Sequence, residues 1–383
     1  MIKRTILLLL AAVFVGFLAV GNGNTVPRSC HLLKAKDFQK YINGKQTGLY
    51  FLKNGKIEAA ITNYGARIVS LNAPDKKGNY ADVVLGFKSI DDYLNAKGIY
   101  HGAIIGRVAG RVENSRIDVD GKLYELQANA SPHQLHGGVG GFHNQVWDVR
   151  EVTDTSIVMS YFSADGEMGY PGNLNVKVTY SLNSKNELSM EVNATTDKTT
   201  PLNLTNHAFF NLAGEGSGTV LNHILTIPSK HICMLKENKI ISTKLLSVKS
   251  TPFDFRKSKA IGRDLIQEKT NEQLKIAGGY DHRFVLSRSE NATVKLVATV
   301  IEPVSGRKME VLTNEPCIHV FTANFFNGSD IGKMGKPLNY RESFALETQR
   351  FPYDANSNSS KSIFLNPGEN YQAKTILRFS VEL

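Results

Sequence analysis

The chain has 383 residues, of which 42% are hydrophobic and 21% charged, with one tryptophan and three cysteines. This composition is typical of a globular protein and argues against a disordered chain, a collagen-like repeat, a long coiled coil or a small disulfide-held domain. The formal net charge is +10, but lysines and arginines are spread along the whole sequence. That spread favours a solvated basic surface over a nucleic-acid site.

The first 21 residues have the pattern of a secretory signal peptide. Lys3 and Arg4 precede an apolar run over residues 6–20, and we predict cleavage after Gly21. The run is too short to cross a bilayer, which takes about 20 apolar residues. We therefore expect export to the periplasm or the extracellular space, and no membrane span in the mature chain of residues 22–383.

Cys30 lies close behind this segment and leaves a lipid anchor open as a less favoured alternative. Residues 27–29, Pro-Arg-Ser, lack the leucine and small residues of a lipidation site. Cys30, Cys233 and Cys317 allow at most one disulfide, and their spacing is unlike that of metal ligands. We expect an ordered chain from about residue 30.

The body of the chain reads as strands, in which apolar and polar residues alternate with a period of two. In chain order the predicted strands are 56–61, 66–71, 117–119, 122–126, 156–161, 174–182, 188–192, 294–301, 308–312 and 373–381. Helical signals are few. The clearest is a short helical turn over 89–94, with Ser89 as its N-cap and Asp92 three residues further on.

Short turns join successive strands into hairpins. Asp120-Gly121 is a strong two-residue turn signal, and residues 183–186 and 303–306 are rich in turn formers. Many hairpins, with no internal repeat and no linker, predict an all-β protein. We expect one large antiparallel β-sandwich that forms a single domain over residues 22–383. Loops and one concave sheet face carry the site in such a fold.

Five short segments place ionisable side chains beside glycine or asparagine. They are Gly106-Arg107-Val108-Ala109-Gly110-Arg111, Leu135-His136-Gly137-Gly138, Asn206-His207-Ala208-Phe209-Phe210-Asn211-Leu212, Gly279-Tyr280-Asp281-His282 and Leu346-Glu347-Thr348-Gln349. Taken singly, each has an ordinary explanation. His207 reads as a structural histidine, Glu347 as a solvated strand residue and Arg111 as half of a surface ion pair.

In this order and spacing, the segments resemble the aldose 1-epimerase family, the galactose mutarotases, from about residue 48 to the C-terminus. The resemblance also includes Asn63-Tyr64-Gly65-Ala66, Asp82-Val83-Val84-Leu85-Gly86-Phe87, Asp165-Gly166-Glu167-Met168-Gly169-Tyr170-Pro171-Gly172 and Asn366-Pro367-Gly368-Glu369. It implies the large β-sandwich of that superfamily, in agreement with the strand pattern. It also implies an isomerase that interconverts the α and β anomers of free aldohexoses such as galactose and glucose.

The resemblance assigns roles to individual residues. It implies His207 as the general acid and Glu347 as the general base, with Arg111, His136 and Asp281 holding sugar hydroxyls. We expect a monosaccharide as the partner, no nucleic acid, no cofactor, and a monomer or weak dimer.

The sequence departs from the family's pattern in three places. Gly110 stands where the family commonly has asparagine before the sugar-binding arginine, and His319 stands where a glutamine often contacts the sugar. Ala208-Phe209 replaces the more usual Ser/Thr-Tyr after the catalytic histidine. We keep Gly110 and His319 as candidate substrate-binding residues. The departures bear on the preferred sugar rather than on the acid and the base.

Anomer interconversion needs one proton removed and another delivered, because an aldopyranose is a cyclic hemiacetal. An ordinary glutamate has a pKa of about 4.3 and an ordinary histidine a pKa of about 6.5. Only modest shifts of these pKa values are needed for a deprotonated glutamate and a protonated histidine near neutral pH. We expect a carboxylate close to His207 to raise the pKa of that histidine.

Other side chains have two interpretations each. Phe209, Phe210 and Tyr170 are candidates for the apolar face of a sugar site, but core positions are favoured. The spacing of His133, His136 and His143 is loose and shows no clear carboxylate partner, so it does not favour a metal site.

The alternative from another functional class is a non-catalytic sugar-binding module on the same fold. The presence of both His207 and Glu347 favours the enzyme, since a binder needs neither proton carrier. A phosphosugar mutarotase would need an additional basic cluster near the pocket, which the sequence does not locate.

Overall fold

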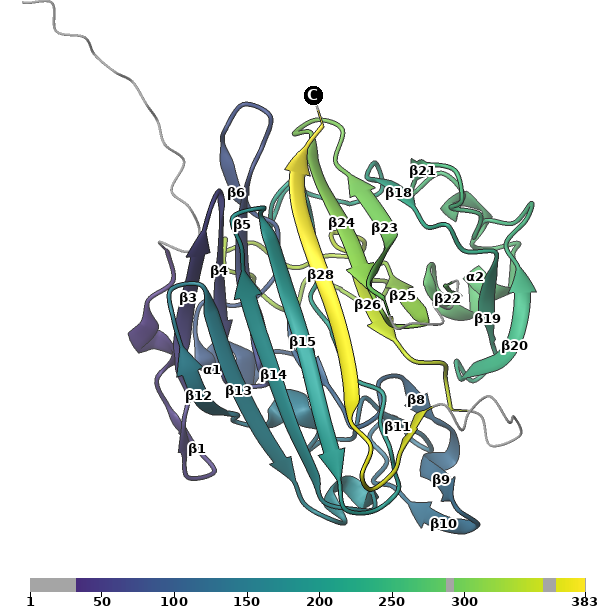
Figure 1. The fold of residues 1–383 in the computed structure, drawn as a ribbon. Coiled ribbons are helices and arrows are strands. Elements are labelled where there is room, and N and C mark those ends of the chain that lie inside the picture. The colour runs from purple at the N-terminus through teal and green to yellow at the C-terminus, as the bar shows by residue number, and fades with distance from the viewer. Residues whose placement is uncertain (1–31, 287–292, 354–362, 383) are drawn as a thin grey trace, which may run out of the picture.

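The computed structural model describes residues 32–286, 293–353 and 363–382, and Figure 1 shows its ribbon. The predicted signal peptide over residues 1–21 and Cys30 lie outside the described residues. Strands predominate, and the α-helices of the described part, α1 (Ile90–Asn95) and α2 (Glu272–Ala277), have six residues each. No helix in these ranges has the length and apolar character that a membrane crossing requires.

A nine-stranded antiparallel sheet of described strands runs across the front of Figure 1 and forms one layer of the fold. In spatial order its strands are β12 (Asp148–Val152), β13 (Ser156–Ser163), β14 (Leu174–Leu182), β15 (Glu187–Thr196), β28 (Tyr371–Val381), β24 (Arg307–Thr313), β23 (Lys295–Ile301), β18 (Ile224–Thr226) and β21 (Lys259–Ala260).

Two smaller antiparallel sheets form the other layer of the described fold. The four-stranded sheet has the order β3 (Leu49–Asn54), β4 (Ile57–Thr62), β5 (Arg67–Pro74) and β6 (Tyr80–Asp82). The five-stranded sheet has the order β20 (Ile241–Ser247), β19 (His231–Leu235), β22 (Asp281–Val285), β25 (Cys317–Phe321) and β26 (Ala345–Gln349).

Short two-stranded pairs and 3-10 turns connect these sheets. The pairs are β1 (Tyr41–Ile42) with β2 (Lys45–Gln46), β7 (Ile104–Ile105) with β17 (Thr205–Asn206), β8 (Arg111–Val112) with β11 (Gln134–Leu135), β9 (Arg116–Val119) with β10 (Lys122–Glu125), and β16 (Thr200–Pro201) with β27 (Phe364–Leu365). The 3-10 turns are η2 (Ala35–Phe38), η3 (Glu113–Ser115), η4 (Phe142–Asn144), η5 (Glu167–Gly169) and η6 (Leu265–Gln267).

The main hydrophobic core fills the space between the two layers. One cluster of buried side chains joins Val178 of the nine-stranded sheet to Ile61 and Ile68 of the four-stranded sheet, and to Ile318 and Val320 of the five-stranded sheet. Along β14 the buried positions alternate with exposed or half-buried ones, as a strand with one face on a core requires. The predicted antiparallel β-sandwich is therefore confirmed.

Local signals in the sequence also predict local structure correctly. Asp120 and Gly121 have φ angles of 53° and 81°, which the two-residue hairpin turn requires. The Ser89 hydroxyl accepts a hydrogen bond of 3.1 Å from the Asp92 N–H and caps α1.

The sequence pattern does not reveal strands β25 and β26 of the five-stranded sheet. β25 and β26 are buried at every position, because one face packs on the core and the other lines a pocket. A strand buried on both faces shows no polar alternation. The helix α2 is also absent from the prediction, although Asn271 caps its start and Gly278, with φ of 69°, ends it.

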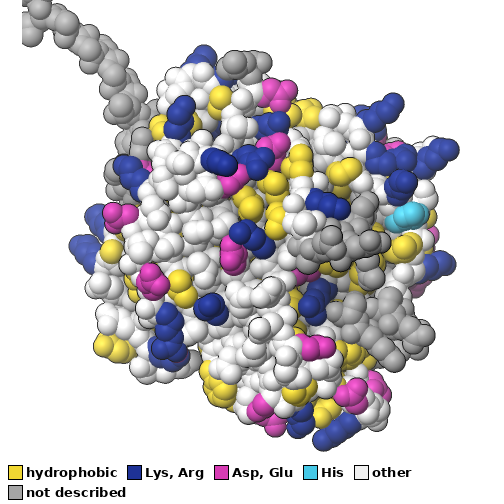
Figure 2. Space-filling view, in the orientation of Figure 1, with side chains coloured by type: hydrophobic (Ala, Val, Ile, Leu, Met, Phe, Trp, Pro, Cys, Tyr) yellow, Lys and Arg dark blue, Asp and Glu magenta, His cyan; other side chains and the backbone are white. Residues whose placement is uncertain are grey.

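Basic side chains are scattered over the surface. Figure 2 shows lysines and arginines across the visible face, mixed with aspartates and glutamates. Some of them pair across neighbouring strands, as Lys374 does with Glu191 at 2.5 Å and Arg378 with Glu187 at 2.7 Å. The visible face therefore has no continuous positive stripe of the kind that follows a nucleic-acid backbone.

Candidate active site

A pocket of about 180 Å³ lies beside the five-stranded sheet, on the face opposite the main core. Side chains from that sheet and from the loops around residues 98–111, 135–136 and 321–326 line it. The sequence-predicted site residues all line this pocket: Gly110, Arg111, His136, His207, Asp281, His319 and Glu347.

Three neighbouring strands bring the polar residues of the pocket together. Arg283 on β22 lies opposite His319 on β25, and His319 lies opposite Glu347 on β26. Opposite residues of an antiparallel pair point to the same face, as do residues two apart on one strand. Asp281 and Gln349 therefore share that face, and the register of the sheet assembles residues from distant parts of the chain.

His207 reaches the pocket from the loop that follows β17. Its N–H donates to the Ala103 carbonyl at 2.8 Å, and its own carbonyl accepts from the Gly102 N–H at 3.0 Å. The Asn206 side chain donates to the Gly102 carbonyl at 2.7 Å and accepts from the Ala208 N–H at 3.0 Å. The Asn-His motif thus clamps the backbone that carries the imidazole.

His207 and Glu347 face each other at the base of the pocket. His207 Nε2 lies 3.5 Å from Glu347 Oε1, and the two residues are 5% and 2% exposed. Glu347 Oε2 accepts a hydrogen bond of 2.9 Å from Gln349 Nε2. Gln349 Oε1 in turn accepts from Arg283 Nη2. This chain of contacts orients the Gln349 amide and leaves Glu347 Oε1 directed at His207.

Burial controls the protonation of this pair, and the expectation for His207 is wrong. Burial lowers the pKa of His207 to about 4 and raises the pKa of Glu347 to about 7. Removing water from the imidazolium outweighs the attraction of the Asp281 carboxylate, which favours the protonated ring. Between these two pKa values the pair holds one proton in total.

A second histidine–carboxylate pair lies beside the first. His319 Nε2 is 2.7 Å from Asp281 Oδ1. Burial opposes ionisation of Asp281, but the hydrogen bond from His319 and the charges of His319 and Arg111 hold the pKa of its carboxyl below the ordinary value. Asp281 is therefore a carboxylate that accepts hydrogen bonds at neutral pH.

The backbone holds His136 in one tautomer. Its Nδ1 accepts a hydrogen bond of 3.2 Å from the Gly110 N–H, and burial lowers its pKa well below the ordinary value. A neutral ring with Nδ1 as acceptor carries its proton on Nε2, so His136 offers a donor. Gly110 has φ of 94°, and a Cβ there would lie 3.3 Å from Arg283 Nη2. Backbone conformation thus explains glycine at this position.

The segment over residues 106–111 carries two arginines with different tasks. Arg107 is buried and donates to the Ser163 hydroxyl at 2.9 Å and the Pro171 carbonyl at 2.8 Å. Arg111, four residues later, is half-buried and lines the pocket. Arg107 therefore holds the loop, and Arg111 is available to a ligand.

Some lining residues are absent from the sequence prediction. Tyr100 stacks on His207 with ring centroids 6.0 Å apart and lies edge-on to His136 at 4.7 Å. Burial raises the pKa of Tyr100 to about 12, so its hydroxyl stays neutral. Arg283 and Gln349 are missed as well, although each lies two residues from a predicted site residue on a strand, which is a usable signal.

The aromatic candidates divide between pocket and core. Phe209 lines the pocket, whereas Phe210 belongs to the main core and Tyr170 to a separate buried cluster. Phe321 and Phe325 line the pocket instead. Both lie at or after the end of β25, and no motif in the sequence marks them.

Of the histidines considered as metal ligands, His136 and His143 both pack edge-on against the Tyr100 ring, with centroids 4.7 Å away, and His133 has other partners. His133 Nδ1 accepts a hydrogen bond of 3.0 Å from the Asn114 N–H, while His136 lines the pocket. Among the residues that the structure describes, no group of three or more His, Cys, Asp and Glu side chains is arranged to hold a metal ion.

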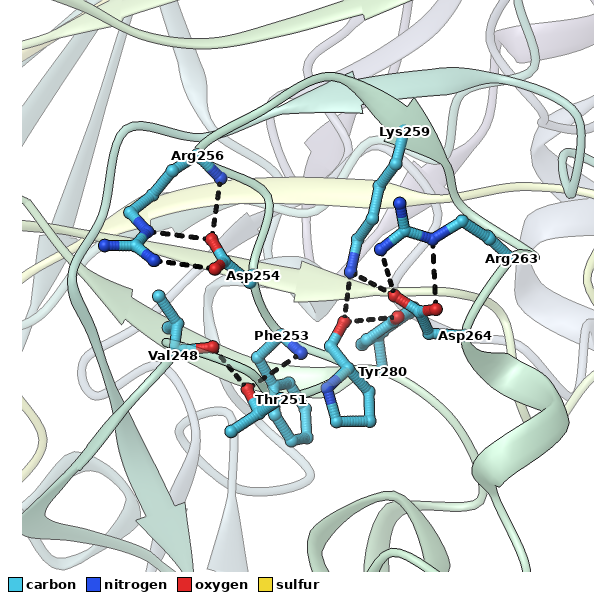
Figure 3. Close-up of polar contacts among 10 residues, drawn as sticks. Val248, Thr251, Phe253, Asp254, Arg256, Lys259, Arg263, Asp264 and Tyr280 are labelled. Carbon is cyan, nitrogen blue, oxygen red and sulfur yellow. Dashed lines mark hydrogen bonds and ion pairs between the residues drawn. The ribbon is translucent and has the colours of Figure 1, made fainter.

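A polar network supports the start of β22, as Figure 3 shows. Lys259 Nζ donates to Asp264 Oδ2 at 2.6 Å and to the Pro252 carbonyl at 2.5 Å, and the Tyr280 hydroxyl donates to that carbonyl at 2.9 Å. Because Tyr280 directly precedes Asp281, this network fixes the backbone from which Asp281 reaches the pocket.

The fold and the pocket together define a class of protein: a β-sandwich with a buried histidine–glutamate pair among the side chains that line one pocket. The comparisons identify the family. The sequence model of the family described as aldose 1-epimerase matches residues 48–378, and the chain belongs to this family.

Individual relatives show the same similarity along nearly the whole chain. The chain is 39% identical to galactose mutarotase from Rattus norvegicus over 330 residues, which cover 86% of this chain and 93% of the relative. It is 33% identical to aldose 1-epimerase from Escherichia coli (strain K12) over 331 residues, which cover 86% and 94%.

Two solved structures share the fold at appreciable sequence identity. An aldose epimerase homologue from C. elegans has a TM-score of 0.78 at 29% identity and covers 88% of this chain and 100% of its own. Galactose 1-epimerase from Lactobacillus acidophilus has a TM-score of 0.77 at 26% identity, with 90% and 97% covered.

Proposed function

We propose that the protein is an aldose 1-epimerase that interconverts the α and β anomers of free aldohexoses, with galactose and glucose as substrates. The observation that carries the proposal is the His207–Glu347 pair, two buried proton carriers 3.5 Å apart at the base of the pocket. Membership of the aldose 1-epimerase family supports the same activity.

The reaction removes one proton from the sugar and delivers another. Glu347, as carboxylate, takes the proton from the C1 hydroxyl while His207, as imidazolium, protonates the ring oxygen O5. The C1–O5 bond breaks and leaves the open-chain aldehyde. Rotation about C1–C2 presents the other face of the carbonyl, and both transfers run in reverse as the ring closes. At the end of the cycle His207 and Glu347 have the same protonation states as at the start, so no other proton donor or acceptor is needed.

A single proton on the pair is enough for both transfers. With the pKa of Glu347 raised and that of His207 lowered, this proton rests on Glu347 between about pH 4 and about pH 7. It moves to His207 before Glu347 acts as the base. The separation of 3.5 Å between Oε1 and Nε2 makes this a short transfer. The resulting carboxylate and imidazolium then attract each other strongly in a buried site.

The other polar groups of the pocket hold the sugar in place. Asp281 accepts hydroxyl protons as a carboxylate, and His136 donates through Nε2. Arg111 donates from a guanidinium, and hydrogen bonds to charged groups are the stronger ones. Holding C1 and O5 against the pair supplies the advantage of a preset geometry.

Polarimetry tests the proposal directly. Freshly dissolved α-glucose and α-galactose should reach anomeric equilibrium faster with the protein than in buffer alone. An equilibration rate equal to that of the buffer, with sugar binding intact, would instead identify a non-catalytic sugar-binding module. A rate survey over galactose, glucose, xylose and arabinose defines the preferred sugar.

We also propose that the protein acts outside the cytoplasm. The basic and apolar pattern of residues 1–21 supports export. Fractionation of cells that express the full chain should place it in the periplasm or the medium, with a mature N-terminus at residue 22. Retention in the cytoplasm with Met1 in place would contradict export, and recovery in the membrane fraction would favour a lipid on Cys30.

A further inference from the structure

The imidazole of His207 is oriented by ring contacts rather than by a hydrogen bond. Within the described residues its Nδ1 has no hydrogen-bond partner. In a histidine that transfers protons, a hydrogen bond at the second ring nitrogen usually fixes the tautomer and the plane of the ring. Here Tyr100 stacks on the imidazole with centroids 6.0 Å apart and planes at 22°, and Phe209 lies against it at 4.8 Å. Ring packing therefore sets the direction in which Nε2 points.

Tyr100 is the ring that three histidines near the pocket share. It is half-buried and lies edge-on to His136 and to His143, with centroids 4.7 Å apart in each pair. These two contacts restrict the movement of the Tyr100 ring while it stacks on His207. A protonated His207 gains more from this neighbour than a neutral one, because the face of a tyrosine ring attracts a cation. The stacking therefore favours the imidazolium that the reaction requires.

Arg67, the first residue of β5, fixes the backbone on both sides of Tyr100. Its side chain is buried, and the residue is 1% exposed. Nη1 donates to the His101 carbonyl at 2.9 Å, and Nη2 donates to the Ile99 carbonyl at 2.9 Å. Nη2 also donates to the His143 carbonyl at 2.7 Å. One guanidinium thus joins the turn that carries Tyr100 to the segment that carries His143.

The Asn63-Tyr64-Gly65-Ala66 segment makes these contacts possible. The Tyr64 ring lies under the guanidinium of Arg67, with the ring centroid 5.1 Å from the guanidinium carbon. Gly65 has φ of 69°, and a Cβ there would lie 2.5 Å from the His143 carbonyl oxygen and 3.0 Å from Arg67 Nε. Glycine therefore leaves the space in which Arg67 meets His143. The segment does not line the pocket and acts on it through Arg67.

The turn over residues 99–103 also binds the loop that carries His207. The Gly102 carbonyl accepts a hydrogen bond of 3.0 Å from the Ile68 N–H, and the Gly102 N–H donates to the His207 carbonyl at 3.0 Å. A Cβ at Gly102, where φ is 71°, would lie 2.0 Å from the Ile68 carbonyl oxygen. The turn is therefore packed directly between β5 and the His207 loop, and a displacement on its β5 side reaches the imidazole.

We infer that Tyr100 is a positioning residue for the epimerase reaction and that Arg67 acts through it. Tyr100 holds the plane of the His207 imidazole, so that Nε2 is directed at Glu347 and at the ring oxygen of the bound sugar. Arg67 holds the backbone of Tyr100 in place. The inference rests on the proposed function and deepens it, since it names residues outside the acid–base pair on which the rate depends.

Tyrosine variants test the stacked ring by polarimetry on α-glucose. Tyr100→Leu removes the ring and should lower kcat about ten- to a hundredfold. KM should change by less than about threefold, because Arg111 and Asp281 still hold the sugar hydroxyls. Tyr100→Phe restores the ring without the hydroxyl and should recover kcat to within about threefold of the unsubstituted protein. Tyr50→Leu is the matched control, since Tyr50 is half-buried on β3, packs against the main core and is outside the pocket lining.

Arginine variants separate positioning from stability. Arg307 on β24 is a matched control for Arg67, because it is 4% exposed and also donates to three backbone carbonyls, those of Ala73, Leu212 and Asn79. Lysine lacks the planar fork of donors, so Arg67→Lys and Arg307→Lys should both lower the unfolding temperature measured by circular dichroism. At a temperature where both variants are folded, only Arg67→Lys should lower kcat, by about tenfold.

The outcomes separate this inference from the proposed function. If the unsubstituted protein accelerates equilibration but Tyr100→Leu is as fast as Tyr50→Leu, the inference is wrong and the epimerase stands. The same conclusion follows if folded Arg67→Lys keeps the kcat of Arg307→Lys, or if Tyr100→Phe is as slow as Tyr100→Leu. If Arg67→Lys does not fold, the tyrosine variants still decide. If the unsubstituted protein equilibrates glucose only at the buffer rate, the epimerase function fails and the inference fails with it.

Discussion

Two clusters of buried ionisable groups, one around Lys333 and one around Glu347, show that burial can serve stability or chemistry. Both residues are 2% exposed. Lys333 Nζ lies 2.6 Å from Glu215 Oε2 and 3.2 Å from Asp82 Oδ2, and it donates to the Val84 carbonyl at 2.7 Å. Burial opposes the charge, but the two carboxylates raise the pKa of the amine. Its three N–H donors have three partners, which hold the amine in its charged form.

The pocket cluster is incompletely paired. Within the described residues His207 Nδ1, His319 Nδ1 and Arg283 Nε have no hydrogen-bond partner. Burial also moves the pKa values of His207 and Glu347 in opposite directions. The comparison teaches that matched donors and acceptors make a buried charge structural, whereas unmatched groups with shifted pKa values remain able to exchange protons with a ligand.

The largest expected effect is on catalysis and concerns the pocket cluster. Glu347→Gln and His207→Asn should each lower kcat for anomer exchange by about 10²–10⁴-fold, since each removes one proton carrier. Because the Glu347 carboxyl is costly to bury, Glu347→Gln should leave the unfolding temperature unchanged or raise it. Polarimetry and thermal unfolding measure the two effects.

The exposed Glu151 on β12 offers a matched control for Glu347. Glu151→Gln makes the same chemical change outside the pocket and should keep full activity. A Glu347→Gln protein with unchanged kcat would show that the Glu347 carboxylate is not the base. The distinction between a structural cluster and a catalytic cluster would then be wrong.

The structural cluster should respond in stability rather than in rate. Lys333→Met leaves Asp82 and Glu215 buried without their cation, so the free energy of unfolding should fall by about 3–5 kcal/mol. Urea denaturation measures the loss. At temperatures where the variant is folded, kcat for glucose should stay within about twofold of the unsubstituted protein. A stable variant with lost activity would reverse the roles of the two clusters.

The pH dependence of kcat/KM sharpens the account of the pocket. Above the raised pKa of Glu347, about 7, the pair loses its one proton and no acid remains, so kcat/KM should fall about tenfold per pH unit. Below the lowered pKa of His207, about 4, both members are protonated and no base remains. The plateau should therefore lie on the acidic side of neutrality. A profile centred above pH 8 would contradict these directions.

Stability is a poor readout of the same two groups. The folded protein binds the Glu347 proton more tightly than the unfolded chain, so this contribution to stability falls as pH rises from about 4.5 to about 7. The folded protein binds the His207 proton less tightly, so that contribution rises between about pH 4 and 6.5. The two contributions oppose each other, and activity is the measurement that resolves them.

The smallest effect concerns His319. His319→Gln keeps a donor for Asp281 but removes the charge interaction by which His319 lowers the pKa of Glu347. The alkaline limb of kcat/KM should therefore move to higher pH. The loss in kcat/KM at the optimum should be less than about tenfold. An unchanged limb would show that His319 only orients Asp281.

The sequence by itself determined much of this protein. Alternation along residues 174–182 predicts β14, and Asp120-Gly121 predicts its hairpin, because both signals act between neighbouring residues. The family motifs point to His207 and Glu347 through their residue types and order. These features can be predicted without knowing which residues pack against them in the folded protein.

Only the tertiary structure decided how these residues work. The register of β22, β25 and β26 sets Arg283, His319 and Glu347 in one row, and no local pattern encodes pairing between such distant segments. The pKa of His207 is lowered because folding removes water from its imidazole ring, and the extent of this burial cannot be read from the sequence. The position of Phe325 in the lining of the pocket, next to Phe321, likewise exists only in the folded chain.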